Sequence, residues 1–484
     1  SGVAGAFSVG TINERANVIF AAFGATLSSY NFTTDTWTAS RTLVGTATDS
    51  INIRLGGTEY LVVAQDTDYD YYDGTTWARS TKNAQFLAFW DDRLWGIDST
   101  GLLWWASTLG TENDDAQLPL PNGSVTNLFV GRIASEDVVL FAATTNGLFV
   151  HDADNQRWVS TLLSLPYHPD AGLGAVRWRD TNYISAGLAI YEHKAIRGIV
   201  EVATVGPDKD HGLPANRRGT IRDLLAGHND LVAIVDATTS PSAVTRYMSE
   251  VASNADVIQA NTGYSHILAW DGQGWQNRWL SETNTQAITA AHLSSAYSRY
   301  QLWWAQDQRI RYMRLPRDVV NPTQVTTLPY ATSATHELPD FTGGDTSVDK
   351  LALRLRVEVN GMSANETVTM RFALNGATTY TLMDDTYSTS VDSAGAITAN
   401  GVALYSFPSS VAPAGTLFRS IRFSADGARG SNTLLTPDIL SITLEWTRKP
   451  IVRLGHTVSI LFPAAGYNNQ TTEAMFDNVR TVIR

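Results

Sequence analysis

The amino-acid sequence predicts an all-β protein, and three observations lead to that class. A motif of an aromatic residue, a polar turn and a tryptophan recurs at Tyr30–Trp37, Tyr71–Trp77 and Trp270–Trp275, with a degenerate copy at Phe149–Trp158. Its closing tryptophans fall near one, two and three multiples of about forty residues, the period of four-stranded repeats. Aromatic residues make up 10% of the chain and charged residues only 17%, a composition that suits a large β-protein. We therefore expect an N-terminal seven-bladed β-propeller, with six blades as the alternative, then a β-sandwich and a short strand-helix segment.

The propeller prediction divides residues 1–332 into seven units of strands. In each motif the aromatic residue ends one strand, Asp-Gly or Thr-Thr-Asp makes the turn, and the tryptophan starts the next strand. The tryptophan is expected to pack between neighbouring blades, because a single blade cannot bury a core alone. The seven units are Ala6–Ser40, Asp49–Ser80, one that starts at Ala84, Val125–Thr161, Gly172–Val205, Thr220–Leu280 and Ala287–Ala331.

The sixth unit carries an insertion at Ala243–Ser265, before its last two strands. Long loops on a rigid scaffold often carry binding functions. This insertion is therefore a candidate contact surface.

A composition shift predicts the end of the propeller. Thirteen of the fourteen tryptophans lie before residue 305, and Asn321–Asp340 is rich in proline. Residues 333–450 are expected to form a β-sandwich, because their apolar and polar residues alternate along strands and Asn-Gly turns separate them. The clearest alternating segments are Leu353–Val359, Val368–Leu374 and Leu440–Trp446.

The last segment, residues 451–484, is expected to hold one strand at His456–Phe462 and the start of a helix at Thr471 or Thr472. The chain opens with Ser-Gly-Val-Ala-Gly and ends just after this helical pattern. We therefore expect it to be a segment of a longer polypeptide that continues into a further domain.

Composition excludes several functional classes. A formal net charge of -12 and no clustered basic residues argue against nucleic-acid binding. The absence of cysteine excludes disulfides, thiol nucleophiles and cysteine-ligated zinc. The nine histidines never fall at the i, i+2 or i, i+4 spacing of zinc ligands. No apolar run approaches the roughly 20 residues that a membrane helix needs, so no membrane insertion is expected.

One acidic cluster is a candidate metal site. Asp66, Asp68 and Asp70 alternate along the chain, so their carboxylates share one side of a strand or loop and could hold Ca²⁺. The calcium-loop pattern of helix-loop-helix proteins fails here, because Tyr71 replaces its glycine and Trp77 its terminal glutamate. A solvated acidic turn is the alternative, and no other cofactor is expected.

Two doubled tryptophans are candidate carbohydrate-binding residues, namely Trp104 with Trp105 and Trp303 with Trp304. Neighbouring residues of a strand point to opposite faces, so one ring of each pair could face solvent. An exposed indole can stack against the apolar face of a sugar. Packing between blades is the alternative interpretation.

The turn motif is not expected to be catalytic. Sialidase-type propellers carry Ser-x-Asp-x-Gly-x-Thr-Trp, whereas Asp73 and Gly74 are adjacent here and Tyr71 replaces the serine. Asp271 and Gly272 depart from the pattern in the same way. No nucleophile elbow, P-loop or dinucleotide-binding fingerprint is present. We therefore expect a protein that is not an enzyme.

The phrase Asp-Gly-Thr-Thr-Trp at 73–77 resembles propellers predicted in large tail proteins of tailed bacteriophages and related prophages. The sandwich phrases Ser363–Val368, Phe418–Phe423 and Thr436–Trp446, the last followed by Arg448-Lys-Pro450, resemble the same group. The resemblance implies a structural component of the virion, in an outward-facing tail or baseplate, and brings no catalytic residues. It implies other tail subunits as partners, a three- or six-fold homo-oligomer, and host surface polysaccharide as a further contact.

Two other functions remain as alternatives. One is a glycosidase or lyase that degrades polysaccharide with residues on propeller loops. The other is a secreted carbohydrate-binding propeller. Fold alone does not decide among them, because propellers host many unrelated activities.

Overall fold

The computed structural model confirms the all-β class. Its described strands are joined by turns and loops, and they include a 3-10 turn, η2, at Ala296–Ser298. The chain separates into two compact units, Ser1–Asp340 with Asp426–Thr436 and Phe341–Ala425 with Pro437–Arg484. The structure describes residues 9–65, 67–119, 124–133, 137–145, 147–165, 170–196, 199–207, 217, 219–238, 263–284, 286–307, 309–315 and 330–449.

Within the described residues the first unit contains seven antiparallel sheets, and in each sheet the strands pair in sequence order. Sheets 1 to 3 consist of β1 (Val9–Arg15), β2 (Val18–Phe23), β3 (Thr26–Asn31) and β4 (Thr36–Thr42); β5 (Ala47–Leu55), β6 (Thr58–Gln65), β7 (Tyr69–Tyr72) and β8 (Trp77–Ser80); and β9 (Phe86–Trp90), β10 (Arg93–Ile97), β11 (Leu102–Thr108) and β12 (Thr111–Gln117).

Sheets 4 to 6 also have four strands, whereas sheet 7 has three within the described residues. They consist of β13 (Val125–Arg132), β14 (Val138–Thr144), β15 (Gly147–Asp152) and β16 (Arg157–Ser164); β17 (Ala175–Trp178), β18 (Thr181–Ala186), β19 (Ala189–Ile196) and β20 (Ile199–Gly206); β21 (Thr220–Ala226), β22 (Leu231–Asp236), β23 (His266–Trp270) and β24 (Trp275–Leu280); and β25 (Ile288–Ser294), β26 (Gln301–Gln306) and β27 (Arg309–Arg314).

Short turns of one type join the first two strands of several sheets. In Ala16–Asn17, Gly56–Gly57 and Asp91–Asp92 both turn residues have a positive φ. That conformation is typical of the type I′ turn, whose twist matches the twist of the strands it connects. Local sequence therefore sets these hairpins. The second strand of sheet 2 is buried from Leu61 to Ala64, in agreement with the buried strand predicted at Tyr60–Ala64.

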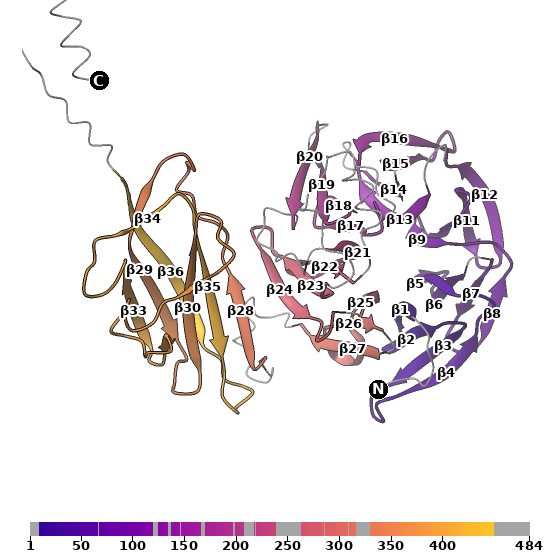
Figure 1. Ribbon diagram of the computed structural model, residues 1–484. Helices are drawn as coiled ribbons and strands as arrows, with labels where there is room; N and C mark the ends of the chain where they lie inside the picture. The colour runs from indigo at the N-terminus through magenta and orange to yellow at the C-terminus, as the bar shows by residue number, and fades with distance from the viewer. Residues whose placement is uncertain are drawn as a thin grey trace, which may run out of the picture. The chain divides into compact units, whose positions relative to one another are not determined.

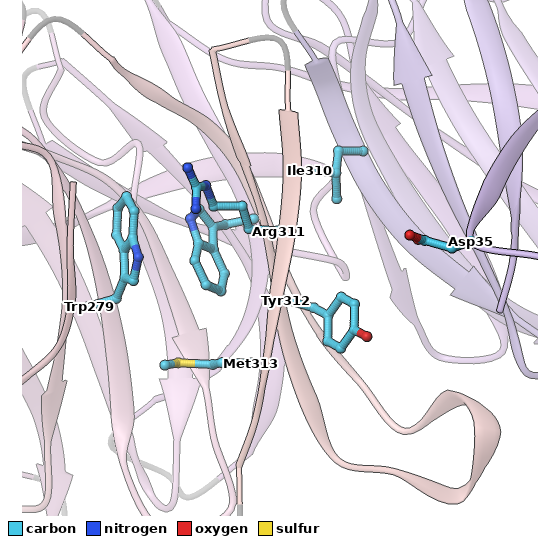
Figure 2. A pocket seen from close by; sticks show the side chains of 7 residues that line it. Asp35, Trp279, Ile310, Arg311, Tyr312 and Met313 are labelled. Carbon is cyan, nitrogen blue, oxygen red and sulfur yellow. The ribbon is translucent and has the colours of Figure 1, made fainter. Parts of the chain in front are cut away.

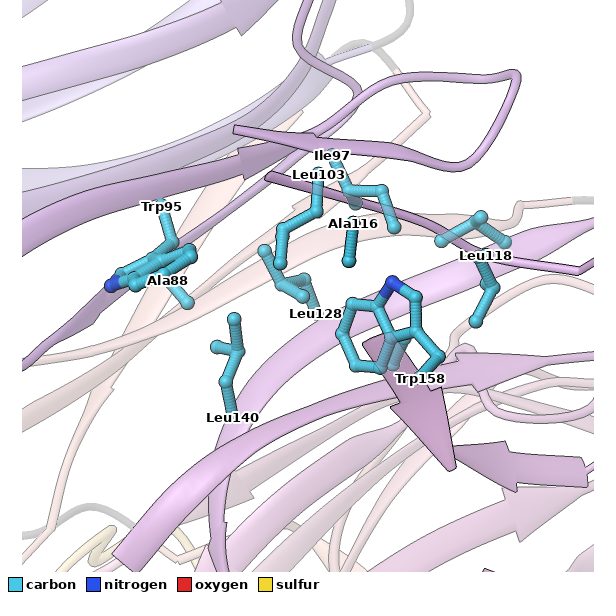
Figure 3. Close-up of a cluster of buried hydrophobic side chains, with 11 residues drawn as sticks. Ala88, Trp95, Ile97, Leu103, Ala116, Leu118, Leu128, Leu140 and Trp158 are labelled. Atoms are coloured by element: carbon cyan, nitrogen blue, oxygen red, sulfur yellow. The ribbon is translucent and has the colours of Figure 1, made fainter. Parts of the chain in front are cut away.

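The seven sheets follow one another around a ring (Figure 1). The first strand of each sheet contacts the first strand of the next, and β25 also contacts β1. Seven buried hydrophobic clusters lie between neighbouring sheets, including one shared by sheets 7 and 1. Figure 3 shows the cluster of sheets 3 and 4, where Trp95 and Leu103 meet Leu128, Leu140 and Trp158. Each sheet is thus held by the one before it and the one after it.

The strands between Ser333 and Arg448 form two further sheets with one buried face each. In β29 the side chains of Leu355 and Val357 are buried while Arg354 and Arg356 are exposed, which confirms the predicted alternation. The first of these sheets contains β28 (Ser333–Glu337), β35 (Ile421–Ala428), β30 (Thr367–Leu374), β31 (Thr381–Leu382) and β32 (Ala396–Ile397), and the second contains β33 (Gly401–Ser406), β29 (Lys350–Asn360), β34 (Thr416–Phe418) and β36 (Asp438–Arg448).

Several sequence predictions fall wholly or partly outside the described residues. They include the strand and helix expected after residue 450, and residues 243–262 of the insertion Ala243–Ser265. Over the part of the chain that the structure describes, no helix has the length and apolar character to span a bilayer.

Candidate functional site

The carboxylates of the repeated motif close turns. Asp73 Oδ1 accepts hydrogen bonds from the backbone N–H groups of Thr75 and Thr76, both at 2.7 Å. Asp271 Oδ1 likewise accepts from Gln273 and Gly274, at 2.8 and 2.9 Å. These backbone hydrogen bonds hold the pKa of both carboxyls below the usual aspartate value. Each carboxylate therefore stays ionised, and the closing of its own turn accounts for its role.

The motif tryptophans pack between sheets, as predicted. The Trp77 indole donates to Ser40 Oγ of the preceding sheet at 3.3 Å, and the Trp275 indole donates to the Val205 carbonyl of sheet 5 at 2.7 Å. Trp158 belongs to the cluster shared with sheet 3. In these sheets a tryptophan at the start of the fourth strand therefore holds the preceding sheet.

The glycine of the motif also makes room for an arginine. Gly74 has φ +102°, and a Cβ added there would lie 2.5 Å from the Arg15 guanidinium of sheet 1. Arg15 donates to the Glu59 carbonyl at 2.9 Å and to the Asp73 carbonyl. The positive φ favours glycine at this position, and the Arg15 guanidinium occupies the space that a side chain would take.

The contacts of Asp70 argue against the calcium-site prediction at Asp66, Asp68 and Asp70. Its buried carboxylate accepts hydrogen bonds from Arg41 at 2.7 Å and from Arg79 at 2.8 Å. Two guanidinium groups therefore supply the positive charge that a metal would supply. Asp66 lies outside the described residues, and no group of three metal-ligating side chains occurs among the residues that the structure describes.

Asp68 differs from Asp70 in its surroundings. Its Oδ2 atom lies 3.5 Å from Arg79 Nε, and burial raises the pKa of Asp68 more than the arginines lower it. Its Oδ1 atom has no hydrogen-bond partner in the described part of the chain. Asp68 thus lies at the margin of the ion-pair cluster that Asp70 organises.

Three of the four doubled tryptophans are core residues, which corrects their prediction as carbohydrate-binding residues. Trp104, Trp303 and Trp304 are exposed by 0%, 1% and 3%. As expected for adjacent strand residues, the two rings of a pair enter opposite clusters, so Trp303 packs toward sheet 1 and Trp304 toward sheet 6. Buried rings offer no face to a sugar.

Trp105 is half-buried, and its remaining ring face meets a cation. The Arg93 guanidinium lies 4.3 Å from the ring centroid. A cation over an indole is attracted by the negative face of the ring. The Arg93 side chain therefore covers the ring surface on which a sugar would stack.

Two acidic residues that the sequence analysis did not single out lie on first strands, nearest the middle of the ring (Figure 1). Asp49 of β5 accepts hydrogen bonds from the backbone N–H groups of Ser50 at 2.7 Å and Leu87 at 2.8 Å. Burial raises the pKa of Asp49 to about 7 despite these bonds. Burial, together with the charge of Asp49, also raises the pKa of Asp223, on β21, to about 7. The middle of the ring thus holds two interacting carboxyls that titrate near neutral pH.

A β-bulge places these residues. One extra residue precedes Asp49 in β5 and Asp223 in β21, and a similar bulge precedes Asn127 in β13. The Asn127 side chain donates to the Leu173 carbonyl of sheet 5 at 2.8 Å. The Asp49 and Asn127 side chains, each after a bulge, therefore link a first strand to the next sheet.

We expect Asp223→Asn to stabilise the protein increasingly as pH rises. The folded-state pKa of about 7 exceeds the ordinary value of 3.8, so the folded chain keeps a proton that the unfolded chain loses. The stability that Asp223 contributes to the wild type is therefore lost as pH rises from about 4 to 7. The advantage of the amide should grow by about 2 kcal/mol between pH 5 and pH 8.

Urea unfolding at both pH values, followed by tryptophan fluorescence, measures this effect. Asp180→Asn is the matched control, since the Asp180 side chain is 77% exposed. The comparison must be between variants at each pH, because burial lowers the pKa of His266 and His292 to about 4. Those histidines make the wild type gain stability as pH rises toward 6.5. An advantage that is equal at both pH values would contradict the prediction.

A hollow of about 460 Å³ lies beside β27. Figure 2 shows Arg311 and Met313 on the same side of the strand as Trp279, and Ile310 and Tyr312 on the side of Asp35. Trp304 also lines the hollow, and its ring centroid lies 5.2 Å from that of Trp279. The hollow thus combines aromatic, basic and acidic groups at the outer strand of sheet 7.

Two buried donors next to the hollow lack hydrogen-bond partners in the described residues, namely Trp304 Nε1 and Arg311 Nε. Another guanidinium nitrogen of Arg311 lies 3.6 Å from the exposed carboxylate of Glu282. Buried donors are normally satisfied, so the site has unused capacity for hydrogen bonds.

Comparisons with known proteins identify no family for the chain. No family model matches, and no curated protein matches. Among solved structures, the extracellular domain of the two component system protein BT4673 from B. thetaiotaomicron is similar at TM-score 0.45 and 13% identity, over 80% of this chain and 45% of that one. The computationally designed Ika8 protein is similar at TM-score 0.42 and 12% identity, over 65% of this chain and 98% of that one.

The mitotic checkpoint complex contains a chain that is similar at TM-score 0.42 and 13% identity, over 64% of this chain and 90% of that one. The chain spans less than half the length of the BT4673 domain. Similarities of this size carry no functional argument.

Proposed function

We propose that the protein is a structural component of a phage tail or baseplate. In this proposal the first unit is a seven-bladed β-propeller, and the strands between Ser333 and Arg448 form a β-sandwich. Both are rigid modules that contact other tail subunits in a three- or six-fold homo-oligomer and reach host surface polysaccharide. The resemblance of the turn and sandwich phrases to phage tail proteins suggests this setting.

The observation that carries the proposal is the use of polar groups for contacts between sheets. The Asp70 carboxylate binds Arg41 of the preceding sheet, and His151 Nε2 lies 2.7 Å from Asp115 of the preceding sheet. Aspartate, arginine and histidine side chains, which often act in catalysis, thus join one sheet to another. Such polar contacts make a structure rigid, as a scaffold must be.

Closure of the ring supports the propeller. Glu14 Oε2 of sheet 1 accepts hydrogen bonds from Ser294 Oγ and from the backbone N–H groups of Ser295 and Ala296, at 2.9 and 3.0 Å. Tyr30 of sheet 1 lies edge-on to Trp303 of sheet 7, with ring centroids 5.2 Å apart. A propeller needs such contacts between its first and last blades, since otherwise both would expose an apolar face.

Quantitative mass spectrometry of purified virions tests the proposal. We expect peptides of this chain in the tail fraction, in a copy number divisible by three. Virions that lack the chain while infected cells contain it would overturn the proposal.

A polysaccharide-degrading enzyme is the second candidate, and Asp49 with Asp223 is the observation that favours it. Glycosidases use paired carboxyls, one of which holds a proton near neutral pH. Release of reducing ends from host polysaccharide, abolished by both Asp49→Asn and Asp223→Asn, would support this candidate. Unchanged polysaccharide at high protein concentration would exclude it for the substrate tested.

A further inference from the structure

The outer edge of sheet 7 differs from the outer edges of the other six sheets. In sheets 1 to 6 a fourth strand pairs with the third, whereas β27 pairs only with β26 among the described residues. An unpaired edge presents backbone N–H and C=O groups that can pair with another strand.

The register shows which backbone groups of β27 point away from β26. Gln306 and Arg309 face each other across a two-residue hairpin, so they exchange the ladder hydrogen bonds. Alternation then directs the backbone of Ile310, Tyr312 and Arg314 away from β26. The bond from Leu315 N–H to the Tyr300 carbonyl, at 2.9 Å, agrees with this phase.

The other sheets indicate which side chain fills the hollow. At the third and fourth strands, Tyr30 faces Trp37, Tyr72 faces Trp77 and Trp270 faces Trp275, with ring centroids 4.7 to 5.4 Å apart. Each of these tryptophans packs toward the preceding sheet.

In sheet 7 the third-strand residue that packs toward the preceding sheet is Met313, and no tryptophan covers it in the described part. The hollow lies there, between Met313, Trp279 and Trp304. An indole placed opposite Met313 would fill this space and contact a thioether and two aromatic rings.

The charge of β27 indicates which other side chains a strand bound at this edge would carry. Its sequence Arg-Ile-Arg-Tyr-Met-Arg contains three basic residues and no acidic residue. Arg309 and Arg311 share the face of Met313, so they lie opposite alternate residues of an added antiparallel strand. Glu282 and Asp35 are the acids at the site, and the exposed Glu282 occupies only one nitrogen of Arg311.

We propose that β27 binds an extended segment of a partner polypeptide by strand addition. The segment carries a tryptophan opposite Met313 and carboxylates opposite Arg311 and Arg309, which gives the pattern Trp-x-Glu-x-Asp. Main-chain hydrogen bonds to Ile310, Tyr312 and Arg314 provide affinity, and the indole and the carboxylates provide specificity.

Fluorescence anisotropy with the labelled peptide Thr-Thr-Trp-Thr-Glu-Thr-Asp and the full chain tests the proposal. We expect saturable binding that weakens about tenfold when the tryptophan becomes serine, and about tenfold in Arg311→Glu. Arg314→Pro should bind more weakly than Arg314→Ala, because only proline removes the outward N–H. Unchanged tryptophan fluorescence of the variants controls for folding.

Hydrogen exchange identifies the occupant. We expect the amides of Ile310, Tyr312 and Arg314 to exchange freely in the chain alone and to be protected by the peptide. Protection in the monomeric chain without peptide would mean that the same chain covers the edge, and would overturn the proposal. Protection that grows with protein concentration would mean that a second copy of the chain covers the edge, and it would also overturn the proposal. Equal affinity for a peptide in which lysine replaces the glutamate and the aspartate would overturn the proposal as well.

Discussion

Asp70→Asn is expected to destabilise the first unit by about 3 kcal/mol, since it removes the charge that a buried ion-pair cluster is built around. The Asp70 side chain is 0% exposed, whereas those of Arg41 and Arg79 are 27% and 29% exposed. The amide keeps the shape of the carboxylate but leaves two guanidinium groups next to each other without a counter-charge. Partial access of both arginines to water limits the loss.

Urea unfolding followed by tryptophan fluorescence measures this loss in the first unit, which contains thirteen of the fourteen tryptophans. Asp180→Asn is the control, because its carboxylate is 77% exposed in its pair with Arg132 and should contribute less than about 1 kcal/mol. Added Ca²⁺ should leave the midpoint of the wild type unchanged. A rise with Ca²⁺ that Asp70→Asn abolishes would restore the metal-site interpretation.

Trp104→Ala is expected to cost about 4 kcal/mol, among the largest losses for a single side chain. The ring is completely buried, stacks on Tyr69 at 5.4 Å, and donates its indole N–H to the Asn83 carbonyl at 2.8 Å. Gly96 lies beneath it, and a Cβ there would meet the ring at 2.1 Å. The surrounding residues pack closely around the indole, so the alanine side chain leaves a cavity.

Trp105→Ala is the matched control on the same strand. It should cost about 1–2 kcal/mol, because the half-buried ring loses less area and the Arg93 guanidinium can turn to water. The same urea titration compares the two variants. Equal losses, or a Trp104→Ala protein of wild-type stability, would contradict the burial on which the correction of the sugar-binding prediction depends.

Local signals made most of the strand pattern predictable. The turn residues and the alternation of apolar side chains act within a few residues, so the strands at Tyr60–Ala64 and Leu353–Val359 could be located without tertiary information. The motif tryptophans were also predictable as contacts between sheets, because a repeated strand unit needs a repeated apolar contact.

Partners distant in sequence were not predictable. Asp70 looked like a metal ligand because Arg41 and Arg79 reach it only after the sheets have packed. Asp49 and Asp223 carry no local motif, and only the ring arrangement brings their charges together. Lys350 begins an alternating strand, yet it is fully buried, and its ammonium donates to the Val348 carbonyl at 2.8 Å.

The bonds from Glu14 to Ser294, Ser295 and Ala296 have a consequence for the timing of synthesis. At roughly 5–20 residues per second, the ribosome needs on the order of 15–60 seconds after the synthesis of Glu14 to reach Ser294–Ala296. During that interval the nascent chain exposes the apolar face of sheet 1 that later meets Trp303 and Ala305. The yield of folded protein should therefore depend more on chaperone access during that interval than on the stability of the finished fold.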